Sequence, residues 1–220
     1  MYVYLRQLTG SLSRRPVPSA RPSTTGTTKM MVTSIAASAI IDVKIDPASG
    51  AVSMLSVEDW SVPCAIGWCG AVASHLKREG DGMTPIGTFP LRYGFYRKDR
   101  LDHIWPVSRF PFVAIQREDR FAWGDDPADA ASYNRLGLSA PDAQHPEALC
   151  RAEDGVYDVV VPIGYNDAEP ILGHGSAIFL HIAHDDLRPT AGCIALMQSD
   201  MMALIARLRP GMLVRIACQR

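Results

Sequence analysis

Long apolar runs are absent from this sequence, and so is any excess of charge of one sign. A membrane-spanning helix needs about 18 or more consecutive apolar residues, and no run approaches that length, so we expect no transmembrane segment. The 22 basic and 23 acidic residues leave a formal net charge of −1, which argues against a nucleic-acid-binding protein. The five cysteines, an odd number, cannot form a complete set of disulfides, so a reduced, reactive thiol is compatible with the sequence.

Acidic residues are missing from the first 41 positions, where the only charges are four arginines and one lysine. Serine, threonine and proline fill much of this stretch, a composition that buries too little apolar surface to fold. We therefore interpret residues 1–39 as a disordered extension or as a mis-annotated start, with translation beginning at Met30 or Met31. The stretch also lacks the continuous apolar region of a secretory signal peptide, so no export signal is visible.

From residue 40 onward the pattern becomes that of a β protein. Alternating residues 40–45 and the returning run 51–55 flank a turn signal and predict a hairpin. Further strands are predicted by apolar, β-branched runs at residues 156–165, 177–182 and 212–216. A short helix is predicted after residue 199. We predict one domain over residues 40–217, mainly β, with mixed β-sheets packed as a sandwich and a few short helices.

Two residues with reactive side chains lie in apolar surroundings near the C-terminal end. His181 lies near the end of the predicted strand 177–182, and Cys193 follows Gly192 on a predicted turn. A free thiol has a pKa of roughly 8.5, so a neighbouring base must take its proton before it can act as a nucleophile. The imidazole of His181 is the candidate base; His174 is the alternative, although its position between two glycines is less fixed by packing.

The turn that carries the cysteine also predicts a site for the oxyanion of an acyl-transfer reaction. Gly192 has no side chain, so the backbone can approach a ligand closely there. Backbone N–H groups of such a turn stabilise the negative oxygen that forms when a thiolate attacks a carbonyl. We therefore predict an oxyanion site on the backbone amides around Gly192 and Cys193, on the turn that begins at Thr190.

The residue types alone leave other interpretations open. A lone cysteine is commonly a small buried apolar residue, and a lone histidine is commonly a hydrogen-bonded core residue. His181 and His184, with Cys193 or Asp185, also offer the ligand types that zinc prefers, which would make the protein a zinc hydrolase. Two histidines three residues apart at a strand end point in different directions, and the sequence has no HExxH helix, so we assign no metal site.

The order of these residues resembles the catalytic motif of the L,D-transpeptidase family (YkuD type). Residues 175–183, GSAIFLHIA, and residues 189–196, PTAGCIAL, are similar to a soluble branch of that family. Two positions depart from the better-studied branch: Ala191 stands where the family often has histidine, and Ala195 where it often has arginine. These departures bear on substrate preference more than on the identity of the nucleophile.

Two further segments extend the resemblance over residues 60–216: KREGDGMTPIGTF at residues 77–89 and YDVVVPIGYND at residues 157–167. In the family, the first segment lies near the substrate cleft, which makes Lys77 a candidate substrate-binding residue. Tyr165 in the second segment, and Arg188 in the connector between the histidine and the cysteine, are further candidates for substrate binding.

The resemblance implies a cysteine acyltransferase that acts on peptidoglycan stem peptides. Cys193 would form a thioester with the donor peptide, His181 would move the proton, and an acceptor amine would complete a cross-link. Water in place of the amine would give L,D-carboxypeptidase or endopeptidase hydrolysis at the same site. A third alternative is a non-catalytic cell-wall-binding module with the same fold.

The resemblance also implies which partners to expect. It calls for neither a metal nor an organic cofactor, and we expect a monomer. A nucleophilic thiol beside an oxyanion site should open a strained β-lactam, so we predict a covalent carbapenem adduct on Cys193. The substrate implies the periplasm or the cell envelope, although the sequence shows no export signal.

Overall fold

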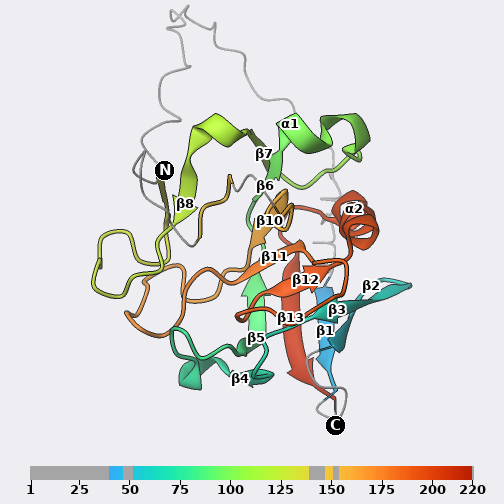
Figure 1. Cartoon of the computed structure of the whole chain (residues 1–220). Helices are drawn as coiled ribbons and strands as arrows, with labels where there is room; N and C mark the ends of the chain where they lie inside the picture. Colours follow the sequence, from blue (N-terminus) through green and yellow to red (C-terminus); the bar gives the residue numbers. More distant parts are fainter. Residues whose placement is uncertain (1–39, 47–51, 139–146, 151–153, 220) are drawn as a thin grey trace, which may run out of the picture. The chain divides into compact units, whose positions relative to one another are not determined.

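Strands in both parallel and antiparallel pairs dominate the computed structural model, which describes residues 40–46, 52–138, 147–150 and 154–219 (Figure 1). The predicted extension, residues 1–39, lies outside the described residues. The strands are β1 (Ile40–Ile45), β2 (Val52–Val57), β3 (Trp60–Ala65), β4 (Ala71–Ala73), β5 (Thr84–Pro90), β6 (Gly94–Arg97), β7 (Phe112–Ile115), β8 (Phe121–Trp123), β9 (Leu136–Leu138), β10 (Val159–Pro162), β11 (Phe179–Ile182), β12 (Ile194–Leu196) and β13 (Leu213–Cys218). The α-helices are α1 (Lys98–Leu101) and α2 (Gln198–Arg207), and the 3₁₀-helices are η1 (Ser74–Leu76), η2 (Asp102–Ile104) and η3 (Arg117–Asp119).

Eleven of these strands form one mixed sheet in the order β4-β5-β13-β1-β2-β3-β12-β11-β10-β6-β7, and β8 pairs with β9 separately. The predicted hairpin of β1 and β2 is confirmed, but β1 also pairs in parallel with β13, the closing strand (blue and red in Figure 1). The prediction of a mainly β fold with mixed sheets and a few short helices is confirmed. None of the described helices is long and apolar enough to cross a membrane.

Alternation along β11 divides its side chains between two hydrophobic clusters. Leu180 and Ile182 belong to the larger cluster, which also contains apolar residues of β1, β2, β3, β13 and α2. Phe179 belongs to the second cluster, together with Cys193. Side chains along a strand alternate with a period of two, so His181 lies on the same face as Phe179. The face of β11 opposite the larger core is therefore the one that carries the candidate site.

Helix α2 closes one side of the larger core, as its apolar spacing predicts. Met201, Leu204 and Ile205 are fully buried, and so is Leu208 directly after the helix. These side chains lie three and four residues apart, which places them on one helical face. Helix α2 follows β12 after a single residue, so its packing also holds the strand that begins next to Cys193.

The second cluster is covered by the small β8–β9 sheet and the segments next to it. Trp123 of β8 and Tyr157 both meet the ring of Phe179 edge-on, at centroid distances of 5.3 and 5.9 Å. Leu149 is fully buried in the same cluster. This aromatic packing supports the strand face on which the thiol and the imidazole lie.

Candidate active site

A thiol and an imidazole lie on the same face of two adjacent parallel strands. His181 of β11 stands opposite Ala195 of β12 in the parallel register. Cys193 immediately precedes β12, and the backbone N–H of Phe179 donates to its Sγ at 3.3 Å. Both His181 and Cys193 line a cavity of about 300 Å³. The parallel pair of β11 and β12 therefore brings the two predicted catalytic side chains to one cavity.

The imidazole of His181 is oriented by the backbone of the next residue. Its Nδ1 lies 2.8 Å from the carbonyl oxygen of Ile182, and the side chain is 7% exposed. Because a carbonyl oxygen only accepts hydrogen bonds, Nδ1 must carry the hydrogen, which leaves the lone pair of the neutral ring on Nε2. The ring of Tyr157 meets the imidazole edge-on at a centroid distance of 5.3 Å. The ring is thus held in the tautomer that a general base requires.

The thiol of Cys193 is protonated in the resting site. It donates to the carbonyl oxygen of Ala177 at 3.2 Å, and only 7% of the residue is exposed. Burial, and to a smaller extent the nearby charge of Glu147, raise the pKa of the Cys193 thiol to about 12 against the lowering effects of the Phe179 N–H and of Lys77. For this thiol to act as a nucleophile, a base would have to remove its proton.

The hydroxyl of Thr190 donates one hydrogen bond and accepts another in the turn before Cys193. The Thr190 Oγ1 accepts from the N–H of Gly192 at 3.1 Å and donates to the carbonyl of Cys193 at 2.7 Å. Gly192 has a φ of +138°, and a Cβ there would lie 2.8 Å from the carbonyl oxygen of Met83. Only glycine fits this position without strain. The Gly192 amide predicted for the oxyanion site is bound to Thr190 in the resting site.

A buried asparagine supports the segment whose carbonyl accepts the hydrogen bond of the thiol. Ala177, with a φ of +52°, donates its N–H to the Asn134 Oδ1 at 3.1 Å. Asn134 also accepts from Trp123 Nε1 at 2.9 Å and donates to the carbonyls of Tyr165 and Asn166 at 3.0 and 2.6 Å. The sequence analysis missed Asn134, because its four partners come from three distant segments. The one sequence signal is that asparagine tolerates positive φ, as it does here at +52°.

Lys77 and Glu79 extend from the loop after η1 into the lining of the cavity. Lys77 is 2% exposed, and its Nζ donates to Asp81 Oδ1 and to the Arg78 carbonyl, both at 2.7 Å. Glu79 Oε2 accepts from Tyr133 at 2.6 Å and from Ser176 Oγ at 2.8 Å. The structure thus places the predicted residue Lys77 at the site, and adds Glu79, which sequence reasoning left without a role.

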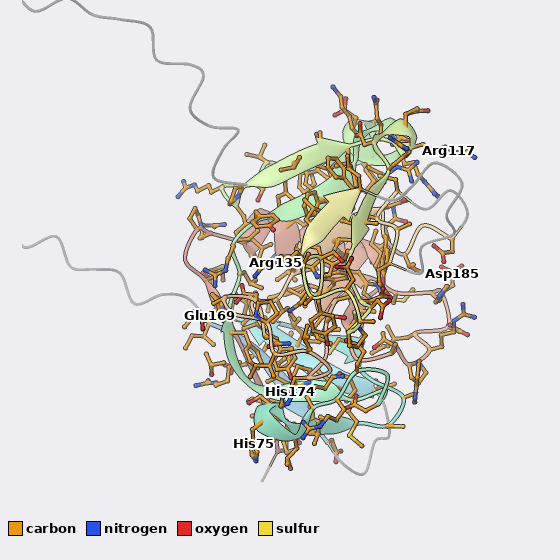
Figure 2. All side chains as sticks on the ribbon, turned by 90° about the vertical axis from the view of Figure 1, so that its left-hand side faces the viewer. His75, Arg117, Arg135, Glu169, His174 and Asp185 are labelled. Atoms are coloured by element: carbon orange, nitrogen blue, oxygen red, sulfur yellow. The ribbon has the colours of Figure 1, made fainter. Side chains whose placement is uncertain are left out.

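The remaining candidates separate into two groups. Arg188 lines the cavity, and its Nη2 lies 2.7 Å from Nε2 of His184. Tyr165 is absent from the cavity lining, and its hydroxyl donates to the carbonyls of His174 and, at 3.2 Å, of Ser74. His174 is also absent from that lining. Figure 2 shows His174 near His75, in agreement with the hydrogen bonds of the Tyr165 hydroxyl to the carbonyls of His174 and Ser74. The cavity therefore contains Arg188 but neither Tyr165 nor the alternative base His174.

The donors that suggested a zinc site do not gather as a ligand set. Both His181 and His184 line the cavity, but the Nε2 of His184 faces the guanidinium of Arg188. Within the described ranges, no three His, Cys, Asp or Glu residues are grouped so that they could hold a metal ion. All five cysteines are free, with Cys69 and Cys218 exposed.

Of three comparisons with known proteins, the one with family models agrees with the motif. A family model described as the L,D-transpeptidase catalytic domain matches residues 43–216, more than half of the chain. The crystal structure of L,D-transpeptidase 1 from Mycobacterium tuberculosis is similar at 14% sequence identity, with a TM-score of 0.35. That alignment covers 82% of this chain and 59% of the other, so the chain spans less than two thirds of that structure's length. Comparison with curated proteins gives no match.

Proposed function

Because the chain belongs to the L,D-transpeptidase catalytic domain family, we propose that it transfers acyl groups between peptidoglycan stem peptides. In this proposal Cys193 is the nucleophile and His181 is the general base. One observation carries it: the thiol and an imidazole whose lone pair lies on Nε2 share one face of adjacent strands and one cavity. This is the pairing of nucleophile and base that covalent acyl transfer requires.

In the first step, Sγ of Cys193 attacks the carbonyl of the donor's diamino-acid residue while the thiol proton passes to Nε2 of His181. The carbonyl oxygen becomes an oxyanion. Its collapse breaks the peptide bond, the terminal D-residue leaves as an amine that takes the proton from His181, and a thioester remains on Cys193. Because burial raises the thiol pKa to about 12, we infer that proton transfer accompanies the attack and does not precede it.

In the second step, an acceptor amine attacks the thioester. His181 takes a proton from that amine and returns it to the departing thiolate, which regenerates the free enzyme. An amine of a second stem peptide yields a cross-link. Water yields carboxypeptidase or endopeptidase products from the same thioester, so the alternative activity differs only in the nucleophile of this step.

The charges of the cavity lining support a peptide substrate that carries both amino and carboxylate groups. Lys77 and Arg188 provide positive charge, and Glu79 and Asp125 provide negative charge. We propose that Lys77 and Arg188 contact carboxylates of the stem peptide. Tyr165 would act indirectly, because its hydroxyl joins the loop of His174 to η1. The substrate in turn suggests work in the periplasm or the cell envelope.

The test is turnover of defined muropeptides, followed by intact mass analysis of the products. Cys193→Ala should abolish both cross-linked and hydrolysed products, and His181→Ala should lower the rate by about 10²–10⁴-fold, the range of general base catalysis. His174→Ala is the matched control, because this histidine does not line the cavity. The assignment fails if Cys193→Ala keeps wild-type turnover, and the base is misplaced if His174→Ala is the more damaging change.

A carbapenem provides a second readout of the same nucleophile. We expect a mass increase equal to that of the drug on the wild-type chain and none on Cys193→Ala. Acylation should be slow, because Ala191 and Ala195 in the cavity lining offer no charged contact to the drug. A folded protein that turns over no muropeptide and forms no adduct would instead support the non-catalytic wall-binding module.

A further inference from the structure

Thr84, the first residue of β5, has a fully buried side chain that joins three segments of the chain. Its Oγ1 accepts from the backbone N–H of Gly67 at 2.9 Å and donates to the carbonyl oxygen of Gly192 at 2.9 Å. The direction of both bonds is unambiguous, because an N–H can only donate and a carbonyl can only accept. The single hydroxyl hydrogen of Thr84 is therefore committed to the carbonyl that precedes Cys193.

That bond also orients the amide of the nucleophile. In a trans peptide, the carbonyl of one residue and the N–H of the next point in opposite directions, and the described residues contain no cis peptide bond. The Gly192 carbonyl points toward buried Thr84, so the N–H of Cys193 points away from Thr84. Cys193 itself lines the cavity, so an amide that points away from Thr84 is compatible with a donor to a substrate carbonyl beside Sγ.

Two other amides of this turn, those of Thr190 and Gly192, are engaged. Thr190 N–H donates to the Ile66 carbonyl at 2.9 Å, and Gly192 N–H donates to Thr190 Oγ1 at 3.1 Å. The N–H of Cys193 has no hydrogen-bond acceptor among the described residues. An amide beside the attacking atom, directed away from the buried Thr84 hydroxyl and without an internal acceptor, is suited to bind the oxyanion of a tetrahedral intermediate.

We propose that Thr84 is a positioning residue for acyl transfer: its buried hydroxyl fixes the Gly192–Cys193 peptide so that the Cys193 N–H serves as an oxyanion donor. The proposal rests on the acyl-transfer function of Cys193. The thiol itself is held by other groups, because its sulfur donates to the Ala177 carbonyl and accepts from the Phe179 N–H. Loss of the hydroxyl should therefore impair reactions that pass through an oxyanion and spare those that do not.

The experiment compares two reactions of the Cys193 thiol in the full-length chain. p-Nitrophenyl acetate acylates a thiol through a tetrahedral oxyanion, whereas iodoacetamide alkylates it by direct displacement without one. Both rates are followed by mass analysis of the Cys193 peptide, because exposed Cys69 and Cys218 also react. The variants are Thr84→Val, which keeps the shape but removes the hydroxyl, and Thr84→Ser, which keeps the hydroxyl. Thr88→Val, at an exposed position of the same strand, is the matched control.

We expect Thr84→Val to slow acylation by about 10–100-fold, a little below the 10²–10³-fold effect of deleting an oxyanion donor outright. Alkylation should stay within about threefold of wild type, and both Thr84→Ser and Thr88→Val should behave like wild type. A parallel fall of both rates in Thr84→Val would show a merely structural role and overturn the proposal, and so would unchanged acylation. Failure on muropeptides with normal acetylation of Cys193 would refute the proposed substrate and leave the role of Thr84 intact.

Discussion

Replacement of Asn134 should be among the most damaging changes outside the cavity lining. The side chain is 95% buried, since 5% of the residue is exposed, and it makes four hydrogen bonds. Two donors, Trp123 Nε1 and Ala177 N, and two acceptors, the carbonyls of Tyr165 and Asn166, lose their partner in Asn134→Ala.

The magnitude follows from these contacts. A neutral hydrogen bond contributes about 1 kcal/mol net, so four of them amount to about 4 kcal/mol. The φ of +52° at Asn134 adds strain in the alanine variant, because alanine in the left-handed region costs about 1 kcal/mol more than a residue that tolerates it. We expect Asn134→Ala to lower the free energy of unfolding by about 5 kcal/mol, a large part of the 5–15 kcal/mol that is typical of a domain.

Urea unfolding measures this change, and Asn134→Gly separates its two parts. Glycine removes the same four hydrogen bonds but accepts a positive φ without strain, so it should be about 1 kcal/mol less destabilising than alanine. Acetylation of Cys193 should also slow in both variants, because the Ala177 carbonyl accepts the hydrogen bond that positions the thiol. A loss below about 1 kcal/mol in Asn134→Ala would refute the reasoning, since it would mean that the four partners find other hydrogen bonds.

Two further changes test the site and the core. Gly192→Ala should fold poorly and lose acyl transfer, because its Cβ would lie 2.8 Å from the Met83 carbonyl at a φ of +138°; wild-type melting temperature and rate in this variant would contradict the role of the turn. Burial raises the pKa of both Cys64 and Cys193 to about 12, above the value of roughly 8.5 in an unfolded chain. Their neutral forms therefore stabilise the fold fully below about pH 8.5, and this stability is lost as the pH rises toward 12. Urea midpoints between pH 7 and 10 should fall, with a smaller slope in Cys64→Ala, and an equal slope in that variant would show that Cys64 does not contribute.

The parts of the fold that could be predicted from the sequence are those that depend on local residue patterns. The hairpin of β1 and β2, the buried strand around His181 and the buried face of α2 follow from alternation and helical spacing. The boundaries were less predictable: the run at residues 156–165 forms a strand only at Val159–Pro162. Turn geometry and pairing partners decide where a ladder ends, and neither is encoded in the periodicity of one segment.

The candidate site could be predicted only where the motif itself names the residues. Tyr165 shows the limit, because its position suggested substrate binding, whereas its hydroxyl is bound to two backbone carbonyls outside the cavity lining. Thr84 and Asn134 show the opposite case. Each contacts a segment of the proposed site through a hydrogen bond between residues distant in sequence, with Gly192 and Ala177 respectively, and no local pattern indicates such a contact.

The sequence by itself determined which residues can react: a cysteine after Gly192 and a histidine within an apolar strand. The tertiary structure decided how they react. The parallel pairing of β11 with β12 brings the thiol and the imidazole to one cavity, and burial there keeps the thiol of Cys193 protonated. The physical reason is that side-chain chemistry is a property of each residue, whereas desolvation, tautomer and peptide orientation depend on neighbours that only the folded chain supplies.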